Sequence, residues 1–308
     1  MSPPPRLVIL DTDPGVDDAL ALLYLRARSD LTLLAITTVF GNADVGTTTR
    51  NALWLRARLS LSAPVHRGAD RPLSRPRGRA PVHVHGENGL GDINLSDHNL
   101  PPPDAGAAHE RIVDLVRAHP GAVTLVAIGP LTNLAQALRA APDIASLVAG
   151  VTIMGGAFGR GNVTPYAEAN IHNDPDAAAE VLAAPWPVTL VPLDATLACV
   201  LTDAAAHDLA RDGGDTGRFA LEVTRGYAAA YARHEGLEGC VLHDVAALVS
   251  LTAPELFSPR FAPVTVAKQG ERIGQTAWAA EGPSVRTLLS VDGPRLAEHF
   301  RQAIVSPG

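Results

Sequence analysis

The chain has 308 residues, of which 46% are hydrophobic, so it is long and apolar enough to bury a large core. Its formal net charge of -7 argues against nucleic-acid binding, which usually relies on a basic face. The two cysteines form neither a disulfide framework nor a metal-ligand spacing, which is typical of a reducing compartment. The first residues lack an apolar signal segment, and no run reaches the roughly 18 apolar residues of a spanning helix. We therefore expect a cytoplasmic protein that binds neither nucleic acid nor membranes.

Four aspartates lie close together near the N-terminus, between a predicted strand and a predicted helix. Residues 7–10 form an apolar run typical of a buried strand, and residues 19–25 have helical spacing. The four are Asp11 and Asp13 at the end of the strand, and Asp17 and Asp18 at the start of the helix. Helix capping explains either Asp17 or Asp18, but it does not explain the two aspartates at the end of the strand. Carboxylates this close repel one another unless a cation or protons intervene, and their hard oxygens suit Ca²⁺ or Mg²⁺.

The same alternation of strand, polar turn and helix continues along the chain. Asn42 follows the second strand and lies at the same expected sheet edge as Asp13, where a helix cap and a ligand role are both open. The strand before the turn at 129–133 should direct a backbone carbonyl into the same crevice. Further strands are expected at 31–39, 122–128, 148–154, 187–191, 263–267 and 287–291, and helices at 45–59, 105–118, 176–182, 203–211, 218–233 and 241–251.

Two histidines lie in a weakly patterned segment that spans residues 64–103. His83 and His85 alternate along a short stretch that we expect to be extended, so that both point to one side. They could form a metal pair, but no third His or Cys follows at ligand spacing. An exposed loop with incidental histidines is the simpler interpretation. The neighbouring glycines favour a mobile loop beside the substrate.

A long polar loop and two later helices carry further candidates. Asn162, Glu168 and Asn170 offer amide and carboxylate groups that can bind sugar hydroxyls, whereas Asp174 before a proline is explained as a helix cap. The pair formed by His243 and Asp244 opens a helix, where Asp can cap or can bring another carboxylate to the first cluster. Tyr227 and Tyr231 share a helix face and belong either to the core or to the site.

These segments, taken together, resemble the inosine-uridine nucleoside hydrolases. The resemblance rests on motifs that follow one another in register: 11–18, 40–42, 129–133, 154–156, 168–171 and 243–244. It implies a single α/β domain over residues 1–308, with a mainly parallel twisted sheet flanked by helices. It also implies hydrolysis of ribonucleosides to free base and ribose, for nucleoside salvage, by a homodimer or homotetramer.

The resemblance also implies a role for each site residue. Ca²⁺ would be held by Asp13, Asp18, Asp244 and the backbone carbonyl of Ile128, and Asp13 would be the general base toward water at the ion. The ribose would be held by Asp17, Asn42, Met154, Asn162, Glu168 and Asn170. Oxygen ligands around the sugar stabilise the oxocarbenium ion that forms as the glycosidic bond breaks. The departing base needs a proton, for which His243 is the first candidate and His85 the second.

The chain departs from the family pattern at two positions. Ala169 stands where many relatives have Phe, and Val245 follows the His-Asp pair where many have Pro. The first change alters the wall near sugar and base, and the second alters the helix start that positions Asp244. The preferred base is therefore left open.

Two other functions compete with this one. Asp11 and Asp13 could be the nucleophile and acid of a haloacid-dehalogenase-type phosphohydrolase, but that chemistry needs a lysine, and Lys268 is the only one in the chain. A non-catalytic, calcium-dependent nucleoside or sugar binder on the same fold is the other alternative, because a fold does not determine a function.

Overall fold

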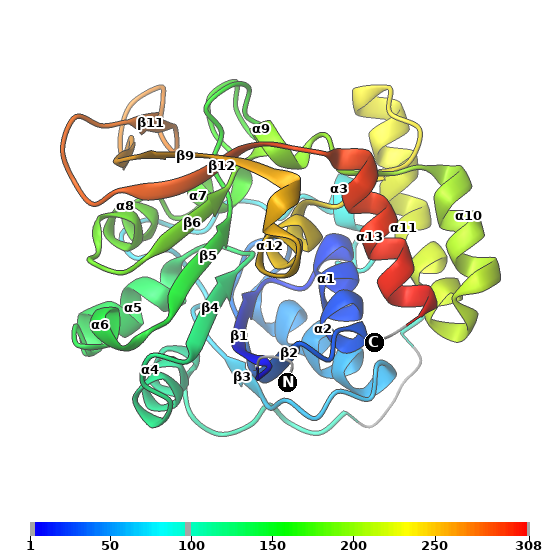
Figure 1. The fold of residues 1–308 in the computed structure, drawn as a ribbon, viewed down its shortest axis with the longest axis horizontal. Coiled ribbons are helices and arrows are strands. Elements are labelled where there is room, and N and C mark those ends of the chain that lie inside the picture. Colours follow the sequence, from blue (N-terminus) through cyan, green and yellow to red (C-terminus); the bar gives the residue numbers. More distant parts are fainter. Residues whose placement is uncertain (1–3, 96–99, 307–308) are drawn as a thin grey trace.

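The computed structural model describes residues 4–95 and 100–306, which form helices around a central eight-stranded sheet (Figure 1). The strands follow one another across the sheet as β3 (Val65–Arg67), β2 (Leu31–Thr38), β1 (Arg6–Thr12), β4 (Val123–Ala127), β5 (Gly150–Met154), β6 (Val188–Val191), β12 (Val285–Val291) and β9 (Phe257–Ala262). All neighbours are parallel except β12 and β9. The predicted α/β fold with a mainly parallel sheet is confirmed.

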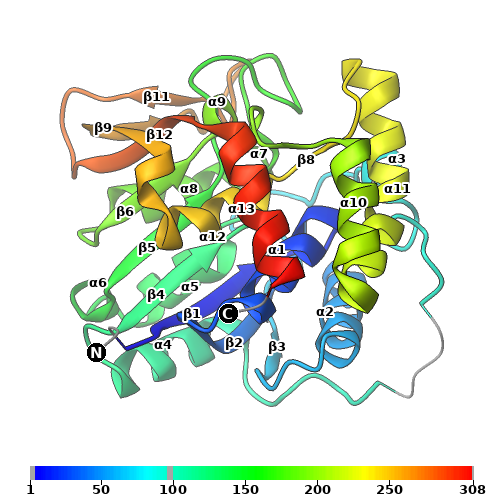
Figure 2. The ribbon, with the colours of Figure 1, turned by 45° about the vertical axis from the view of Figure 1, so that its right-hand side comes forward.

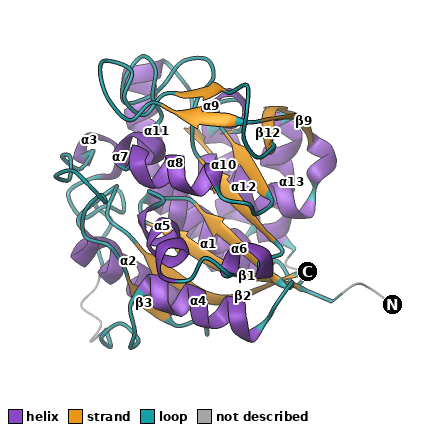
Figure 3. Ribbon diagram, turned by 90° about the vertical axis from the view of Figure 1, so that its left-hand side faces the viewer, coloured by secondary structure: helices purple, strands orange, loops and turns teal. Residues whose placement is uncertain are grey.

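Helices cover both faces of the sheet, because successive strand residues point to opposite faces and both must be buried. In β1, Val8 and Leu10 pack into the core on one face, and Ile9 packs into the core on the other. The first face is covered by α1 (Val16–Ala27), α2 (Val45–Arg58), α11 (Gly214–Glu235), α12 (His243–Thr252) and α13 (Gly293–Val305), and the second by α4 (Ala108–Ala118), α5 (Thr132–Ala140), α6 (Ile144–Leu147) and α8 (Pro175–Ala183). Figure 2 shows α10 (Asp203–Asp212) beside α11, and Figure 3 shows α4, α5 and α8 in front of the sheet.

The order of the strands creates a natural binding crevice. From β1 the chain runs to β2 and β3 on one side, and then returns to place β4 on the other side. The loops that leave β1 and β4 therefore diverge, and ligands bind at such a switch point in open α/β sheets. Asp13 follows β1 and Ile128 follows β4, so both lie at this edge.

Several short elements differ from the sequence predictions. His83 and His85 belong to a helical turn, α3 (Val82–His85), and not to an extended stretch, because the backbone N–H of Gly86 closes the turn on the Val82 carbonyl at 2.9 Å. The polar loop before α8 contains the short helix α7 (Ala169–Asn173). The helix expected at 241–251 begins at His243, since a small ribbon of β7 (Val200–Leu201) and β8 (Cys240–Val241) precedes it. The strands β3 and β9 were not predicted, and the remaining elements are α9 (Leu193–Thr196), the hairpin of β10 (Val264–Val266) and β11 (Thr276–Trp278), and a 3₁₀ turn at Pro254–Leu256.

Candidate active site

A cleft of about 690 Å³ lies at the carboxyl edge of the sheet. It brings together most of the predicted site residues: Asp17, Asn42, His85, Ile128, Met154, Asn162, Glu168, Asn170, His243 and Asp244. Asp13 and Asp18 are buried and do not line the cleft directly.

The first aspartates are held by backbone and side-chain donors. Asp18 accepts hydrogen bonds from the Gly15 backbone N–H at 2.8 Å, from Asn42 Nδ2 at 3.1 Å and from the Thr12 hydroxyl. Asp13 Oδ2 accepts the backbone N–H of Asn42 at 2.7 Å. Asn42 is therefore a structural partner of both carboxylates, whereas Asp44 provides the cap of α2.

Burial and mutual repulsion disfavour the charged form of these carboxylates. Burial raises the pKa of Asp17 and of Asp18 to about 6. For Asp13, burial and then the charge of Asp18 raise the pKa well above its usual value. Burial and the charges of Asp17, Asp18 and Asp13 do the same for the pKa of Asp244, which shows that the four groups lie within electrostatic range of one another.

The donor set fits a divalent cation. Carboxylate oxygens of Asp17, Asp18 and Asp244 lie within 4.8 Å of one another. Asp13 Oδ1, Asp17 Oδ1 and Asp244 Oδ2 are buried and have no hydrogen-bond partner among the described residues. Buried charged oxygens without a partner are unfavourable in a protein that lacks a cation, and carboxylates are the ligands that Ca²⁺ and Mg²⁺ prefer.

The opposite wall of the cleft is built around the start of α7. Both oxygens of Glu168 accept backbone N–H groups, from Asn170 at 2.8 Å, Gly156 at 2.9 Å and Ile171 at 3.1 Å. Asn170 Nδ2 donates to the carbonyls of Ile128 and Met154, both at 3.1 Å. Asn162 is exposed at the edge of this wall, where its Oδ1 accepts the Ala169 backbone N–H at 3.0 Å. This network fixes the wall before any ligand binds.

A chain of hydroxyls and rings forms the remaining wall. His243 Nδ1 contacts the Thr196 hydroxyl, and its Nε2 contacts the Tyr231 hydroxyl, each at 2.7 Å. The Tyr227 hydroxyl lies 3.5 Å from both the Tyr231 hydroxyl and Asp17 Oδ2. The ring of His85 stacks on Tyr227 with centroids 5.4 Å apart. Both tyrosines thus belong to the site and not only to the core.

Both candidate histidines are neutral in this environment. Burial lowers the pKa of His243 to about 3 and that of His85 to about 4. Both ring nitrogens of His243 already have partners, and Tyr231, whose hydroxyl contacts Nε2, lines the same cleft.

The supporting donors behind the site, Thr37 and Asn133, were not predicted from the sequence, and it was wrong to group Asp11 with the aspartates of the cleft. Asp11 does not reach the cleft; it accepts the Thr37 hydroxyl at 2.5 Å and Asn133 Nδ2 at 2.7 Å, and burial raises its pKa to about 7. Asn133 stands in one of the matched motifs, and Thr12 stands between two motif aspartates. Their positions within the motifs 129–133 and 11–18 were the only sequence signal that could have identified Asn133 and Thr12 as part of the site.

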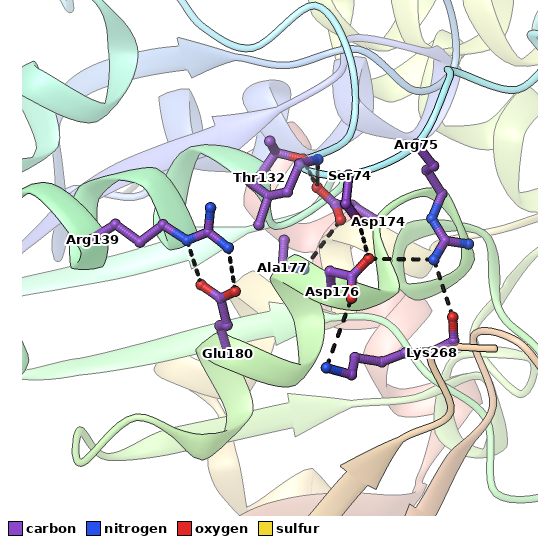
Figure 4. Close-up of polar contacts among 10 residues, drawn as sticks. Ser74, Arg75, Thr132, Arg139, Asp174, Asp176, Ala177, Glu180 and Lys268 are labelled. Carbon is purple, nitrogen blue, oxygen red and sulfur yellow. Dashed lines mark hydrogen bonds and ion pairs between the residues drawn. The ribbon is translucent and has the colours of Figure 1, made fainter.

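Lys268 does not lie beside the aspartates, where a phosphohydrolase would need a lysine. Its Nζ lies 3.9 Å from Asp176 on α8 (Figure 4). It is absent from the lining of the cleft that holds Asp17. The arrangement therefore gives no support to an aspartyl-phosphate mechanism.

Comparison with known proteins agrees with this geometry. The family model for the inosine-uridine preferring nucleoside hydrolases matches residues 8–298. The chain belongs to this family. Uridine nucleosidase 1 of Arabidopsis thaliana is 38% identical over 97% of this chain and 93% of its own length. A non-specific ribonucleoside hydrolase of Salmonella paratyphi A is also 38% identical, over 96% of this chain and 98% of its own.

The three-dimensional structure supports the same assignment. A plant nucleoside hydrolase superposes on this nucleoside hydrolase with a TM-score of 0.94, at 32% identity, and covers 99% of this chain and 100% of the other.

Within the described residues, no helix is both long enough and apolar enough to cross a bilayer.

Proposed function

We propose that this nucleoside hydrolase cleaves the N-glycosidic bond of ribonucleosides to free base and ribose, with Ca²⁺ as its cation. The observation that carries the proposal is the set of buried, unpartnered carboxylate oxygens beside a cleft that tyrosines and histidines also line. The two similar enzymes named above act, by their names, on uridine and on ribonucleosides in general.

The cation would be held by Asp13, Asp18, Asp244 and the carbonyl of Ile128. Asp17, whose carboxylate is also within reach of Asp18 and Asp244, would contact the ion or the sugar. When bound, the ion would act as a Lewis acid that lowers the pKa of water.

Asp13 would serve as the general base. Its free Oδ1 can accept a proton from water as the water oxygen forms a bond to C1′ of the ribose, while Asn42 holds the other oxygen. The electron pair of the broken carbon–nitrogen bond leaves with the base. Negative groups that face the sugar stabilise the positive charge that develops on it.

The ribose would be held by Asp17, Asn42, Asn162, Glu168 and Asn170, with Met154 packed beside it. Glu168 and Asn170 are already fixed by backbone contacts, so they would bind hydroxyls with little loss of conformational freedom. This wall would orient C1′ toward Asp13.

The departing base would receive its proton through the aromatic wall. The Tyr231 hydroxyl can donate to the base, and its proton can be replaced from His243 Nε2, while the Thr196 hydroxyl donates to His243 Nδ1. His85 would hydrogen-bond the base from its place against Tyr227. We further propose that the enzyme is cytoplasmic, forms a homodimer or homotetramer, and consists of one domain over residues 1–308.

A panel assay tests the function. Release of base and ribose would be measured from uridine, cytidine, inosine and adenosine, with Ca²⁺ or after its removal. Calcium-dependent release from at least one nucleoside is expected. If no nucleoside is cleaved while calcium and ribose still bind, the chain is a binding protein and the proposed reaction is wrong.

A further inference from the structure

The segment that leads into α3 is unusually basic for an acidic protein. Residues 71–86 contain four arginines and no carboxylate. Two of these arginines have different surroundings: Arg75 contacts α8, whereas Arg79 lines the cleft.

Arg75 and its neighbours fasten the beginning of this segment to the body of the protein (Figure 4). Its guanidinium contacts Asp176 Oδ2 at 3.3 Å and the Lys268 carbonyl at 3.1 Å. The Leu73 backbone N–H donates to Asp174 at 2.9 Å, and Ser74 also contacts Asp176. These contacts anchor the chain four residues before Arg79.

The end of the segment is also held in place by hydrogen bonds. The first turn of α3 begins at Pro81, whose carbonyl accepts the backbone N–H of Val84 at 2.9 Å. Arg79 is therefore held between two fixed points, and its side chain reaches the same cleft as His85 and Tyr231.

Arg79 brings a positively charged guanidinium to the cleft, and this group has no ion-pair partner among the described residues. No hydrogen bond or ion pair joins it to another residue in the described ranges 4–95 and 100–306. The nearby acid that lines the cleft, Glu235, is already paired with Arg160 at 2.6 Å. The carboxylates that would hold the cation follow β1 or open α1 and α12, so a nucleoside whose ribose is held there would direct the outer edge of its base away from them.

A guanidinium donates hydrogen bonds and cannot accept them. His85 adds a second donor: its Nδ1 accepts the Val16 backbone N–H at 3.3 Å, so the neutral ring carries its proton on Nε2. The atom farthest from the ribose is an oxygen in uracil, hypoxanthine and xanthine, whereas cytosine and adenine place an amino group there. Donors suit the oxygen and are poorly matched to the amino group.

We propose that Arg79 binds the outer edge of the base and selects nucleosides whose base presents oxygen there. This inference rests on the proposed function. The electron pair that leaves with the base spreads onto that oxygen, so the guanidinium stabilises the leaving group as well as the bound substrate. The base of xanthosine, which is largely anionic at neutral pH, benefits most.

The experiment measures kcat/KM for uridine and inosine, whose bases present an oxygen, and for cytidine and adenosine, whose bases present an amino group. It compares wild type, Arg79→Ala and the matched control Arg77→Ala. Arg77 is an exposed residue of the same segment that does not line the cleft. In Arg79→Ala, kcat/KM should fall about tenfold for uridine and inosine, and further for xanthosine, because a charge-assisted hydrogen bond is lost. The values for cytidine and adenosine should stay within about twofold, and Arg77→Ala should match wild type.

The outcomes separate the two proposals. If Arg79→Ala leaves the ratio of kcat/KM for uridine to that for cytidine unchanged, the proposed role of Arg79 is wrong, although the protein is still a hydrolase. A wild-type enzyme that releases no base from any nucleoside would overturn the proposed function, and this inference with it. Arg79→Lys should restore part of the preference, since it keeps the charge but loses the planar donor pair.

Discussion

Removing the cation should destabilise the protein, and the effect should increase with pH. Burial raises the pKa of Asp17 and Asp18 from 3.8 to about 6. A carboxyl whose pKa is raised by folding stabilises the native state fully below its unfolded pKa, and this contribution is lost as the pH rises through about 6. Without a cation, stability should therefore decline between about pH 4 and pH 7. A bound cation favours the ionised carboxylates and should remove this decline.

The size of the effect follows from one carboxyl alone. A shift from 3.8 to about 6 corresponds to about 3 kcal/mol at pH 8. With an unfolding entropy of roughly 2.1 cal/mol/K per residue, 3 kcal/mol changes the Tm of a 308-residue protein by about 5 °C.

Thermal unfolding of dialysed, metal-free protein, with and without added Ca²⁺, measures this effect. The gain in Tm from Ca²⁺ should be small at pH 5 and about 5 °C or more at pH 8. Asp244→Asn should lose the response, whereas Asp215→Asn, at an exposed site on α11, should respond as wild type does. An equal gain at both pH values, or none at either, would refute the idea that the cation compensates for crowded carboxylates.

Three further predictions concern single residues. Asp13→Asn should lower kcat for uridine at least about 100-fold with KM nearly unchanged, as measured by steady-state kinetics; a normal kcat would exclude Asp13 as the base. Tyr231→Phe should lower kcat for uridine about tenfold or more, but should spare a nitrophenyl riboside, whose leaving group needs no proton; similar losses on both substrates would contradict proton donation. Glu168→Gln directs an amide donor toward backbone N–H groups, so it should reduce the free energy of unfolding by about 2 kcal/mol in urea titrations; unchanged stability would show that the cap is dispensable.

Much of the sheet and its binding edge could be predicted, because buried parallel strands leave continuous apolar runs in the sequence. The strand before Asp11, the helix after Asp17 and the position of Asn42 all follow from that pattern. The edge strand β9 could not be predicted, since most of its residues are exposed and it contains a proline.

The details of the site were harder to predict, because they depend on contacts between distant segments. The segment around His85 is too short for periodicity to distinguish a helical turn from a strand. The pairing of Tyr231 with His243 joins two helices across a short ribbon, and no spacing rule encodes it. For α2, the sequence suggested Asn42 as a possible cap, but the structure shows that Asp44 caps this helix.

The arrangement of helices explains why acids rather than neutral ligands occupy the switch point. Asp18 lies in the first turn of α1 and Asp244 in the first turn of α12, and these two helices pack against each other. Each helix N-terminus contributes roughly half a positive charge, which stabilises nearby carboxylates. Two such termini offset about one charge, whereas four aspartates meet here, so a divalent cation or protons must supply the rest. A protonated Asp13 cannot accept a proton from water. The same crowding that selects a cation therefore makes Asp13 a competent base only when the cation has replaced the protons.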